Sequence, residues 1–152
     1  MKRILSVASM IGVVGIAALT ATHVRAQSVA SPSKTATQLI RGDAVQWVTA
    51  RPGQDMSVLW GDPRTGPYGR FNRFTAGFED RPHSHTRDLR VVVISGTMIV
   101  QVAEGSPVEL ISGSYALIPG GASHTHSCKG GSACVLFVQQ DGANDTTPIQ
   151  AR

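Results

Sequence analysis

The sequence predicts an all-β domain, a jelly-roll or small barrel, and three observations lead to this class. Short runs rich in Val, Ile, Leu, Phe and Trp recur from residue 44 onward, and Gly- and Pro-containing turns separate them. After residue 26 no segment keeps a 3.6-residue apolar period over three turns, which argues against an amphipathic helix. Of the 152 residues, the 126 that follow residue 26 suffice for one core and not for two domains.

The first 26 residues have the composition of a secretory signal peptide. Lys2-Arg3 precede an apolar stretch over residues 4–21, and Val24-Arg25-Ala26 suits cleavage after Ala26. The competing interpretation is an uncleaved membrane anchor, but serines, glycines and Thr20 interrupt the stretch, which is short for a bilayer span. We therefore expect a bacterial Sec-type signal peptide and a periplasmic or secreted mature protein without a stable membrane anchor.

The charge balance and the absence of known motifs argue against nucleic-acid binding, serine hydrolysis and nucleotide chemistry. The whole chain has 14 basic and 10 acidic residues, but Lys2, Arg3 and Arg25 fall in the signal peptide, which leaves 11 basic residues against 10 acidic ones. The mature chain has no basic run, so nucleic acid is not an expected partner. It also has no Gly-x-Ser-x-Gly motif, phosphate loop or dinucleotide fingerprint, which argues against a serine hydrolase or a nucleotide enzyme.

The mature chain divides into a flexible N-terminal arm (27–43), a barrel domain (44–141) and a C-terminal tail (142–152). Both ends are small and polar, and we expect them to be loosely held. Turn residues at 51–53, 61–63, 66–67, 104–107 and 129–132 separate the apolar runs. The predicted strands are 44–48, 57–60, 68–74, 89–95, 97–102, 108–111, 114–118 and 133–139.

Two motifs in the barrel region carry three histidines. The first places His83 and His85 after Gly77, and the second places His124 after Gly113, Pro119 and Gly121. Because side chains alternate along a strand, a spacing of two puts His83 and His85 on one face. Neutral imidazole is the commonest protein ligand of transition metals, so the pattern predicts a site for a divalent metal.

These motifs resemble the two signatures of the cupin superfamily, Gly-x5-His-x-His-x(3,4)-Glu-x6-Gly and Gly-x5-Pro-x-Gly-x2-His-x3-Asn. The run from Leu59 to Gly69 also resembles small exported bacterial cupins without an agreed activity. The resemblance implies a single-domain jelly-roll β-barrel, a metal such as iron, zinc, nickel, copper or manganese, and a homodimer as one arrangement. The matching positions are Gly77, His83, His85, Gly96, Gly113, Pro119, Gly121 and His124.

The sequence departs from the signatures at two positions. The metal-binding glutamate is replaced by Leu89 or Arg90, and the final asparagine by Cys128. Three candidates could complete the ligand set: Asp88, swung inward by a bulge, His126, on the same strand face as His124, or a water molecule.

Charged residues near the first motif have two interpretations. Arg90, with Arg87 and Asp88, could form an ion pair at the mouth of the pocket and select an anionic ligand, or the three could be surface charges of little energetic effect. We assign Arg87 to the surface and leave both interpretations open for Arg90. Glu79 and Asp80 are interpreted as loop charges.

Cys128 and Cys134 are the two cysteines and flank a Gly-containing turn. An exported protein favours a disulfide between them, because oxidising compartments preserve such bonds. The alternative is that Cys128 faces the metal as a thiolate, as the resemblance to thiol-oxidising cupins would imply.

Two functions from different classes follow. The first is a metal-dependent cupin enzyme in which His83, His85 and His124 hold a metal that acts on a small organic molecule. An iron-type centre would favour oxygenase chemistry, and zinc or nickel would favour hydrolysis or isomerisation. The second is a non-catalytic module that binds or senses a small ligand, and it stays open because no nucleophile with its base stands out.

Overall fold

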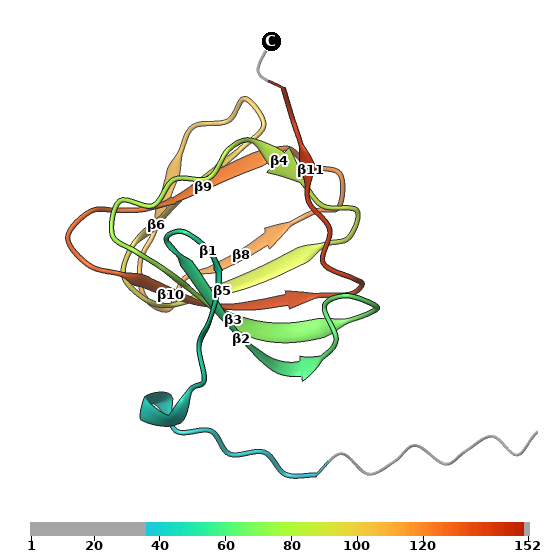
Figure 1. Ribbon diagram of the computed structural model, residues 1–152. Coiled ribbons are helices and arrows are strands. Elements are labelled where there is room, and N and C mark those ends of the chain that lie inside the picture. The colour runs from blue at the N-terminus through green and yellow to red at the C-terminus, as the bar shows by residue number, and fades with distance from the viewer. Residues whose placement is uncertain (1–35, 151–152) are drawn as a thin grey trace, which may run out of the picture. The chain divides into compact units, whose positions relative to one another are not determined.

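Two antiparallel β-sheets face each other in the computed structural model, which describes residues 36–150 (Figure 1). Sheet A has six strands and sheet B has five. In spatial order, sheet A consists of β1 (Val48–Arg51), β2 (Gln54–Gly61), β3 (Tyr68–Phe74), β10 (Cys134–Gln140), β5 (Leu89–Ser95) and β8 (Tyr115–Ile118). Sheet B consists of β11 (Thr147–Pro148), β4 (His83–Ser84), β9 (His124–Cys128), β6 (Met98–Val102) and β7 (Val108–Leu110).

The strand order confirms the predicted all-β jelly roll. Strands far apart in the sequence are neighbours, since β10 lies between β3 and β5, and β9 lies between β4 and β6. Within the described residues the only helix is the short 3-10 turn η1 (Gly42–Ala44), and no helix there has the length and hydropathy that a bilayer span requires. The predicted signal peptide, residues 1–26, lies outside the described residues.

Two predicted strands, 68–74 and 89–95, match β3 and β5 residue for residue. The first predicted strand, 44–48, is wrong in position, because η1 ends at Ala44 and β1 begins only at Val48. The hairpin at Gly53, where φ is +79°, sets this register by pairing Val48 with Met56. Trp47, just before β1, packs against Phe71 with the ring centroids 6.5 Å apart and the ring planes tilted by 33°.

Three strands, β4, β9 and β11, were not among the predicted strand ranges. None of the three contains the Val, Ile, Leu, Phe or Trp residues that marked the others, since β9 reads His-Thr-His-Ser-Cys. The segment 142–152 was expected to be a loose tail. In the structure Thr147 pairs with Ser84 and Pro148 with His83, so its described part adds a strand to sheet B beside the histidine motif.

The apolar core lies between the sheets. Its buried members are Phe74, Val93, Met98, Cys128, Cys134, Leu136 and Val138. Cys128 and Cys134 form a disulfide with the Cα atoms 5.8 Å apart, and no described cysteine is free. The disulfide joins the end of β9 to the start of β10, while His124 begins β9 at its opposite end. One end of the barrel interior is therefore apolar and cross-linked, and the other end carries histidines.

Candidate metal centre

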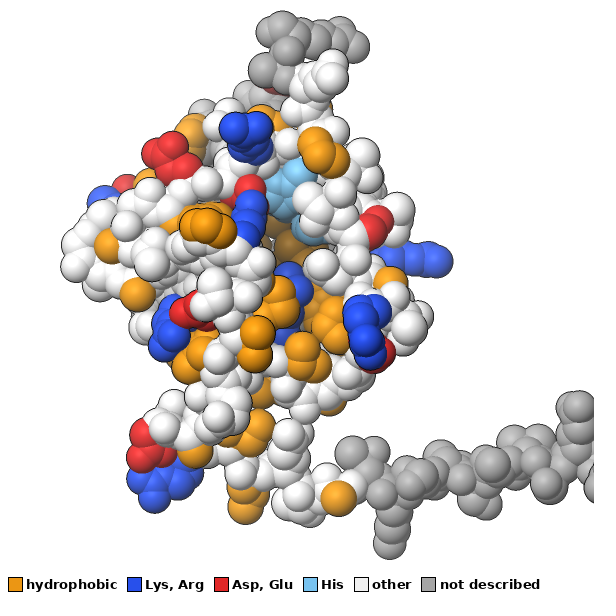
Figure 2. Space-filling model, in the orientation of Figure 1, with side chains coloured by type: hydrophobic (Ala, Val, Ile, Leu, Met, Phe, Trp, Pro, Cys, Tyr) orange, Lys and Arg blue, Asp and Glu red, His pale blue; other side chains and the backbone are white. Residues whose placement is uncertain are grey.

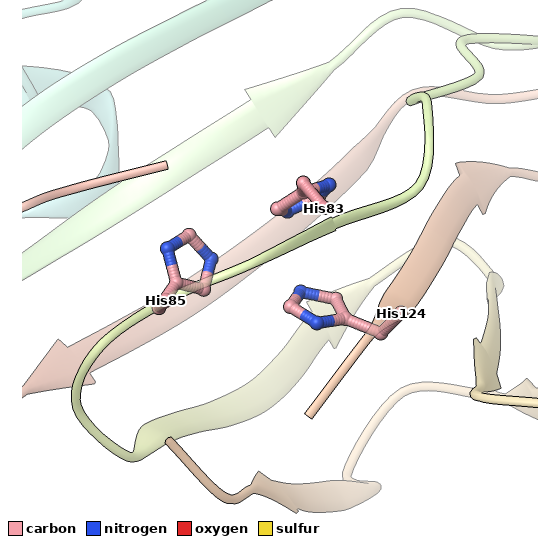
Figure 3. Close-up of side chains that lie close together, drawn as sticks. All are labelled: His83, His85 and His124. Atoms are coloured by element: carbon pink, nitrogen blue, oxygen red, sulfur yellow. The ribbon is translucent and has the colours of Figure 1, made fainter. Parts of the chain in front are cut away.

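Three histidines converge inside the barrel (Figure 3). His83 lies on β4, His85 follows it, and His124 begins β9, where it pairs with His83. Their exposed fractions are 5%, 9% and 2%. The second motif is tied to the first at Gly121, whose N–H donates to the carbonyl oxygen of His85 at 2.7 Å. Gly121 has φ +80°, a conformation that glycine adopts without strain.

Each imidazole of this histidine triad uses Nδ1 for a hydrogen bond to the backbone. Because a carbonyl oxygen only accepts, Nδ1 must carry the proton, and Nε2 keeps its lone pair. The same bond fixes the orientation of the ring, as in metal-binding histidines generally. The partners are the carbonyl oxygens of Arg81 for His83 (2.7 Å), of Ala122 for His124 (3.1 Å) and of Asp145 for His85.

The geometry and electrostatics of the triad suit a metal ion. One ring nitrogen from each histidine lies within 4.8 Å of the other two, and the Nε2 of His124 is buried without a hydrogen-bond partner. Burial lowers the pKa of His124 to about 4 and also lowers the pKa of His85, so both rings are neutral near pH 7. Neutral rings with free lone pairs are the form that binds a divalent cation.

His126 lies beside the triad and belongs to a second group, with Asp80 and His83. Its ring packs against Phe74 and Phe78, at centroid distances of 5.2 and 6.0 Å, and burial lowers its pKa. The Nε2 of His126 is 3.5 Å from the Asp80 carboxylate but makes no hydrogen bond. The structure therefore does not bring His126 into the triad, where it was a candidate fourth ligand.

Asp80 is not the solvated loop charge that the sequence analysis expected. Its side chain is 13% exposed, and both of its oxygens accept hydrogen bonds from Arg51 on β1. Burial by itself would raise the pKa of Asp80, but the hydrogen bonds from Arg51 and the nearby His126 outweigh it and lower the pKa. Asp80 is thus an ionised carboxylate already paired with a guanidinium.

Asp88 and Arg90 lie away from the triad. The Asp88 carboxylate accepts a hydrogen bond from the Gly120 N–H at 2.9 Å, and its side chain is 46% exposed. Arg90 forms an ion pair with Asp141 at 2.6 Å, and neither Asp88 nor Arg90 lines the interior cavity. The bulge that would turn Asp88 inward does not form, because Asp88 holds the second motif through Gly120 instead.

A cavity of about 320 Å³ extends from the triad between the two sheets. Figure 2 shows the face on which it opens: histidine side chains lie in a hollow, with basic side chains near it. Deeper in the barrel its wall is apolar, formed by residues of β3, β5, β6, β8 and β10. These include Phe74, Val91, Val93, Met98, Ile118, Leu136 and Val138.

Two polar residues of this wall, Arg70 and Asn72, were not predicted as site residues. Both lie on β3 and are 7% and 5% exposed. Arg70 Nε and Asn72 Oδ1 are buried without a hydrogen-bond partner. The signal was present in the correctly predicted strand 68–74, because a period of two places Arg70 and Asn72 on the same face as the buried Tyr68 and Phe74.

The family follows from the sequence match. Residues 35–143 match the family model described as the ChrR cupin-like domain. This chain belongs to that cupin family. A comparison with curated proteins finds no match.

Solved structures share the cupin fold at low sequence identity. KdgF from Halomonas sp. is 20% identical with a TM-score of 0.58, and the alignment covers 70% of this chain and 94% of KdgF. The polyketide cyclase RemF from Streptomyces resistomycificus is 16% identical with a TM-score of 0.64, covering 77% and 88%. A chain of the Rhodobacter sphaeroides complex of SigE with the anti-sigma ChrR is 18% identical with a TM-score of 0.55, covering 66% and 51%.

This cupin departs from the superfamily signature in the chemistry of its ligands. Leu89 begins β5 at the usual glutamate position and lines the cavity, so no carboxylate is supplied there. Cys128, at the asparagine position, is in the disulfide and is not a thiolate that could face a metal. The triad therefore offers three imidazole nitrogen donors and no anionic one.

Proposed function

We propose that this cupin binds a divalent transition metal through Nε2 of His83, His85 and His124 and holds a small organic molecule beside it in the barrel cavity. The observation that carries the proposal is the shared hydrogen-bond pattern, in which every Nδ1–H is given to a backbone carbonyl oxygen. Three rings with the same tautomer present three lone pairs from within 4.8 Å of one another. Nitrogen donors of this kind suit iron, zinc, nickel, copper or manganese.

A bound metal would act as a Lewis acid or a redox centre toward the molecule in the cavity. The protein's own residues would do the rest. The apolar wall around Val93 and Leu136 excludes water, and the fixed orientation of the triad keeps the rings in place without rearrangement. This arrangement supports the enzyme candidate.

The second candidate, a binding or sensing module without turnover, is favoured by the state of Asp80. Among the described residues that line the cavity, Asp80 is the single carboxylate, and it is ionised and paired with Arg51. A general acid or base needs a pKa near the working pH and a free position, and Asp80 has neither. ChrR itself is called an anti-sigma protein in the structure with SigE. A cupin domain of this family is therefore compatible with a role in binding or sensing.

The test of the metal site is elemental mass spectrometry on residues 27–152 purified without a metal-affinity tag. We expect close to one metal ion per chain and loss of that metal in the His83→Ala, His124→Ala double variant. The mature chain has one histidine outside the triad, His126. His126→Gln is therefore the matched control and should keep its metal. His83 belongs to both candidate groups, so the single variant His85→Ala separates them. Metal that is lost in His126→Gln and kept in His85→Ala would move the site to Asp80, His83 and His126.

We also propose that the protein is exported and that residues 1–26 are removed. The disulfide between the buried Cys128 and Cys134 supports export, since such bonds persist in oxidising compartments. Mass spectrometry of the protein recovered from the periplasm and the medium of a bacterial host should find an N-terminus at Gln27. A full-length protein confined to the membrane fraction would contradict cleavage.

A further inference from the structure

The inner face of β3 carries a buried guanidinium without an acidic partner. Arg70 is 7% exposed, its Nε has no hydrogen-bond partner, and none of the ion pairs among the described residues includes it. Its favourable contact is with the Tyr68 ring, whose centroid is 5.1 Å from Cζ. Arginine stays protonated even when buried, so Arg70 is an uncompensated positive charge. Such a charge in a cavity wall indicates that its partner arrives with a ligand.

Asn72, two residues along the same strand, adds a second unmet group. Its Oδ1 accepts no hydrogen bond and needs a donor. The strand neighbours on β10 are apolar, since Arg70 pairs with Val138 and Asn72 with Leu136. A guanidinium and an unpaired amide oxygen therefore lie side by side between apolar strand neighbours, in the wall of the cavity that contains the triad.

The charge of the whole site also favours an anion. The triad contributes no acidic side chain, and the one carboxylate of the cavity wall among the described residues, Asp80, is already paired with Arg51. With the proposed divalent metal bound, the interior would hold the metal's charge and that of Arg70 without compensation. Opposite charge in a low-dielectric interior is strongly attracted.

We infer that the cavity binds a small hydroxy carboxylic acid, with its carboxylate on the Arg70 fork and its hydroxyl donating to Asn72 Oδ1. Arginine pairs with carboxylates through two parallel hydrogen bonds, which fixes the orientation of the acid. The apolar part of the ligand lies against Val93, Leu136 and Val138. A volume of about 320 Å³ is at the small end of ligand sites and suits a molecule of this size. The inference rests on the proposed function for the role of the metal, whereas the contacts with Arg70 and Asn72 need none.

The test is calorimetric titration of metal-loaded residues 27–152 with three matched probes. They are 2-hydroxy-3-methylbutanoate, its amide, which has no charge, and 3-methylbutanoate, which has no hydroxyl. We expect the hydroxy acid to bind at least tenfold more tightly than either of the others. Equal affinity for acid and amide, or no binding of any probe, would overturn the inference without the use of a variant.

The variants identify the residue. Arg70→Met should lower the affinity for the hydroxy acid at least tenfold and leave the metal content unchanged. Asn72→Leu should remove the preference for the hydroxy acid over 3-methylbutanoate. Arg73→Met is the matched control, because Arg73 lies on the other face of β3, paired with Asp55 at 2.7 Å. If Arg70→Met does not fold, Arg70→Lys keeps the charge but cannot donate two parallel hydrogen bonds to a carboxylate, so it should still lower the affinity for the hydroxy acid. Unchanged affinity in either folded Arg70 variant contradicts the assignment.

The two proposals fail in distinguishable ways. A wild-type protein that takes up no metal but still binds the hydroxy acid through Arg70 would refute the metal site and keep the acid site. A protein that holds one metal and binds acid and amide equally would keep the metal site and refute the acid site.

Discussion

At the residue scale, burial controls the chemistry of the histidines. His124 is 2% exposed and has a neutral ring, because charging an imidazole inside the barrel is costly. The same burial leaves its Nε2 without a partner. A ring that is neutral, oriented and unpaired is suited to a metal and poorly suited to an acidic solution.

The stability of the metal-free protein should therefore fall as the pH falls from about 6.5 to about 4. The unfolded chain takes up a proton on His124 near the ordinary pKa of 6.5, whereas the folded chain resists until the pKa of about 4. The free energy of unfolding should drop by on the order of 3 kcal/mol across this window from His124 alone. Urea unfolding at several pH values measures it. His124→Gln should flatten the dependence, and an unchanged slope in that variant would contradict the assignment.

Leu89 gives a second prediction at this scale. It stands at the cupin glutamate position and lines the cavity of the triad. Leu89→Glu should raise the affinity for a divalent metal at least tenfold, because an anionic oxygen joins three imidazole nitrogens. A competition titration with a zinc indicator measures the change. Leu117→Glu, at a position that is 48% exposed on β8, adds the same charge elsewhere and should change little. Equal gains in both variants would refute a ligand role at position 89.

At the element scale, the polar strands of sheet B hold the site together. β4 is only two residues long, yet it pairs with β9 on one side and β11 on the other. The segment before β11 supplies the Asp145 carbonyl oxygen that accepts from His85, and the Asp145 carboxylate accepts from the Thr86 N–H at 3.0 Å. The C-terminal segment thus orients one ring of the histidine triad without adding a side chain to it.

Deletion of residues 142–152 should weaken metal binding by 10- to 100-fold, roughly the effect of losing an outer-shell partner of a ligand. The expected cause is loss of the hydrogen bond that orients His85. The same indicator titration measures it. Thr147→Ala keeps the backbone pairing of β11 and is the control that should bind normally. A deleted protein that folds and binds metal with wild-type affinity would show that His85 needs no such support.

The disulfide allows a prediction for the β9–β10 connection. It closes a loop with a sequence separation of 6, and both of its residues are buried. Cys128→Ala with Cys134→Ala should lower the free energy of unfolding by about 2 kcal/mol through the greater freedom of the unfolded chain. The metal content should not change, because the bond lies at the other end of β9 from His124. Loss of metal in this variant would instead support the alternative in which Cys128 contacts the metal.

At the scale of the whole molecule, the barrel combines stability and function in one interior. The core residues Val93, Leu136 and Val138 also form the cavity wall, so the ligand site is an extension of the core. A metal that binds only the folded barrel stabilises it by mass action. Chelation should therefore lower the melting temperature of the loaded protein by roughly 10 °C, as a loss of a few kcal/mol does in a domain of this size.

Differential scanning calorimetry with and without EDTA measures this shift. The His83→Ala, His124→Ala double variant provides the control, since its melting temperature should not respond to EDTA. A wild-type protein whose melting temperature is also unchanged by EDTA would contradict a bound metal.

The sequence by itself determined the barrel and the three histidines. Short runs rich in Val, Ile, Leu and Phe located β3 and β5 to the residue, because such side chains favour strands. The motif glycines made the histidines recognisable, since Gly77 and Gly121, with φ of +76° and +80°, occupy backbone conformations that other residues rarely adopt. These are local constraints, and local constraints can be read from a single chain.

Only the tertiary structure decided the rest of the site. It showed that Asp88 accepts a hydrogen bond from Gly120 and that Arg90 pairs with Asp141. It packed His126 against Phe74 and Phe78. It also joined His85 by a hydrogen bond to Asp145, 60 residues further along the chain. It also turned Arg70 into the cavity without an acidic partner. The physical reason is that a charge's partner, or its lack of one, depends on which strands become neighbours. In this jelly roll the neighbours of a strand come from distant parts of the sequence.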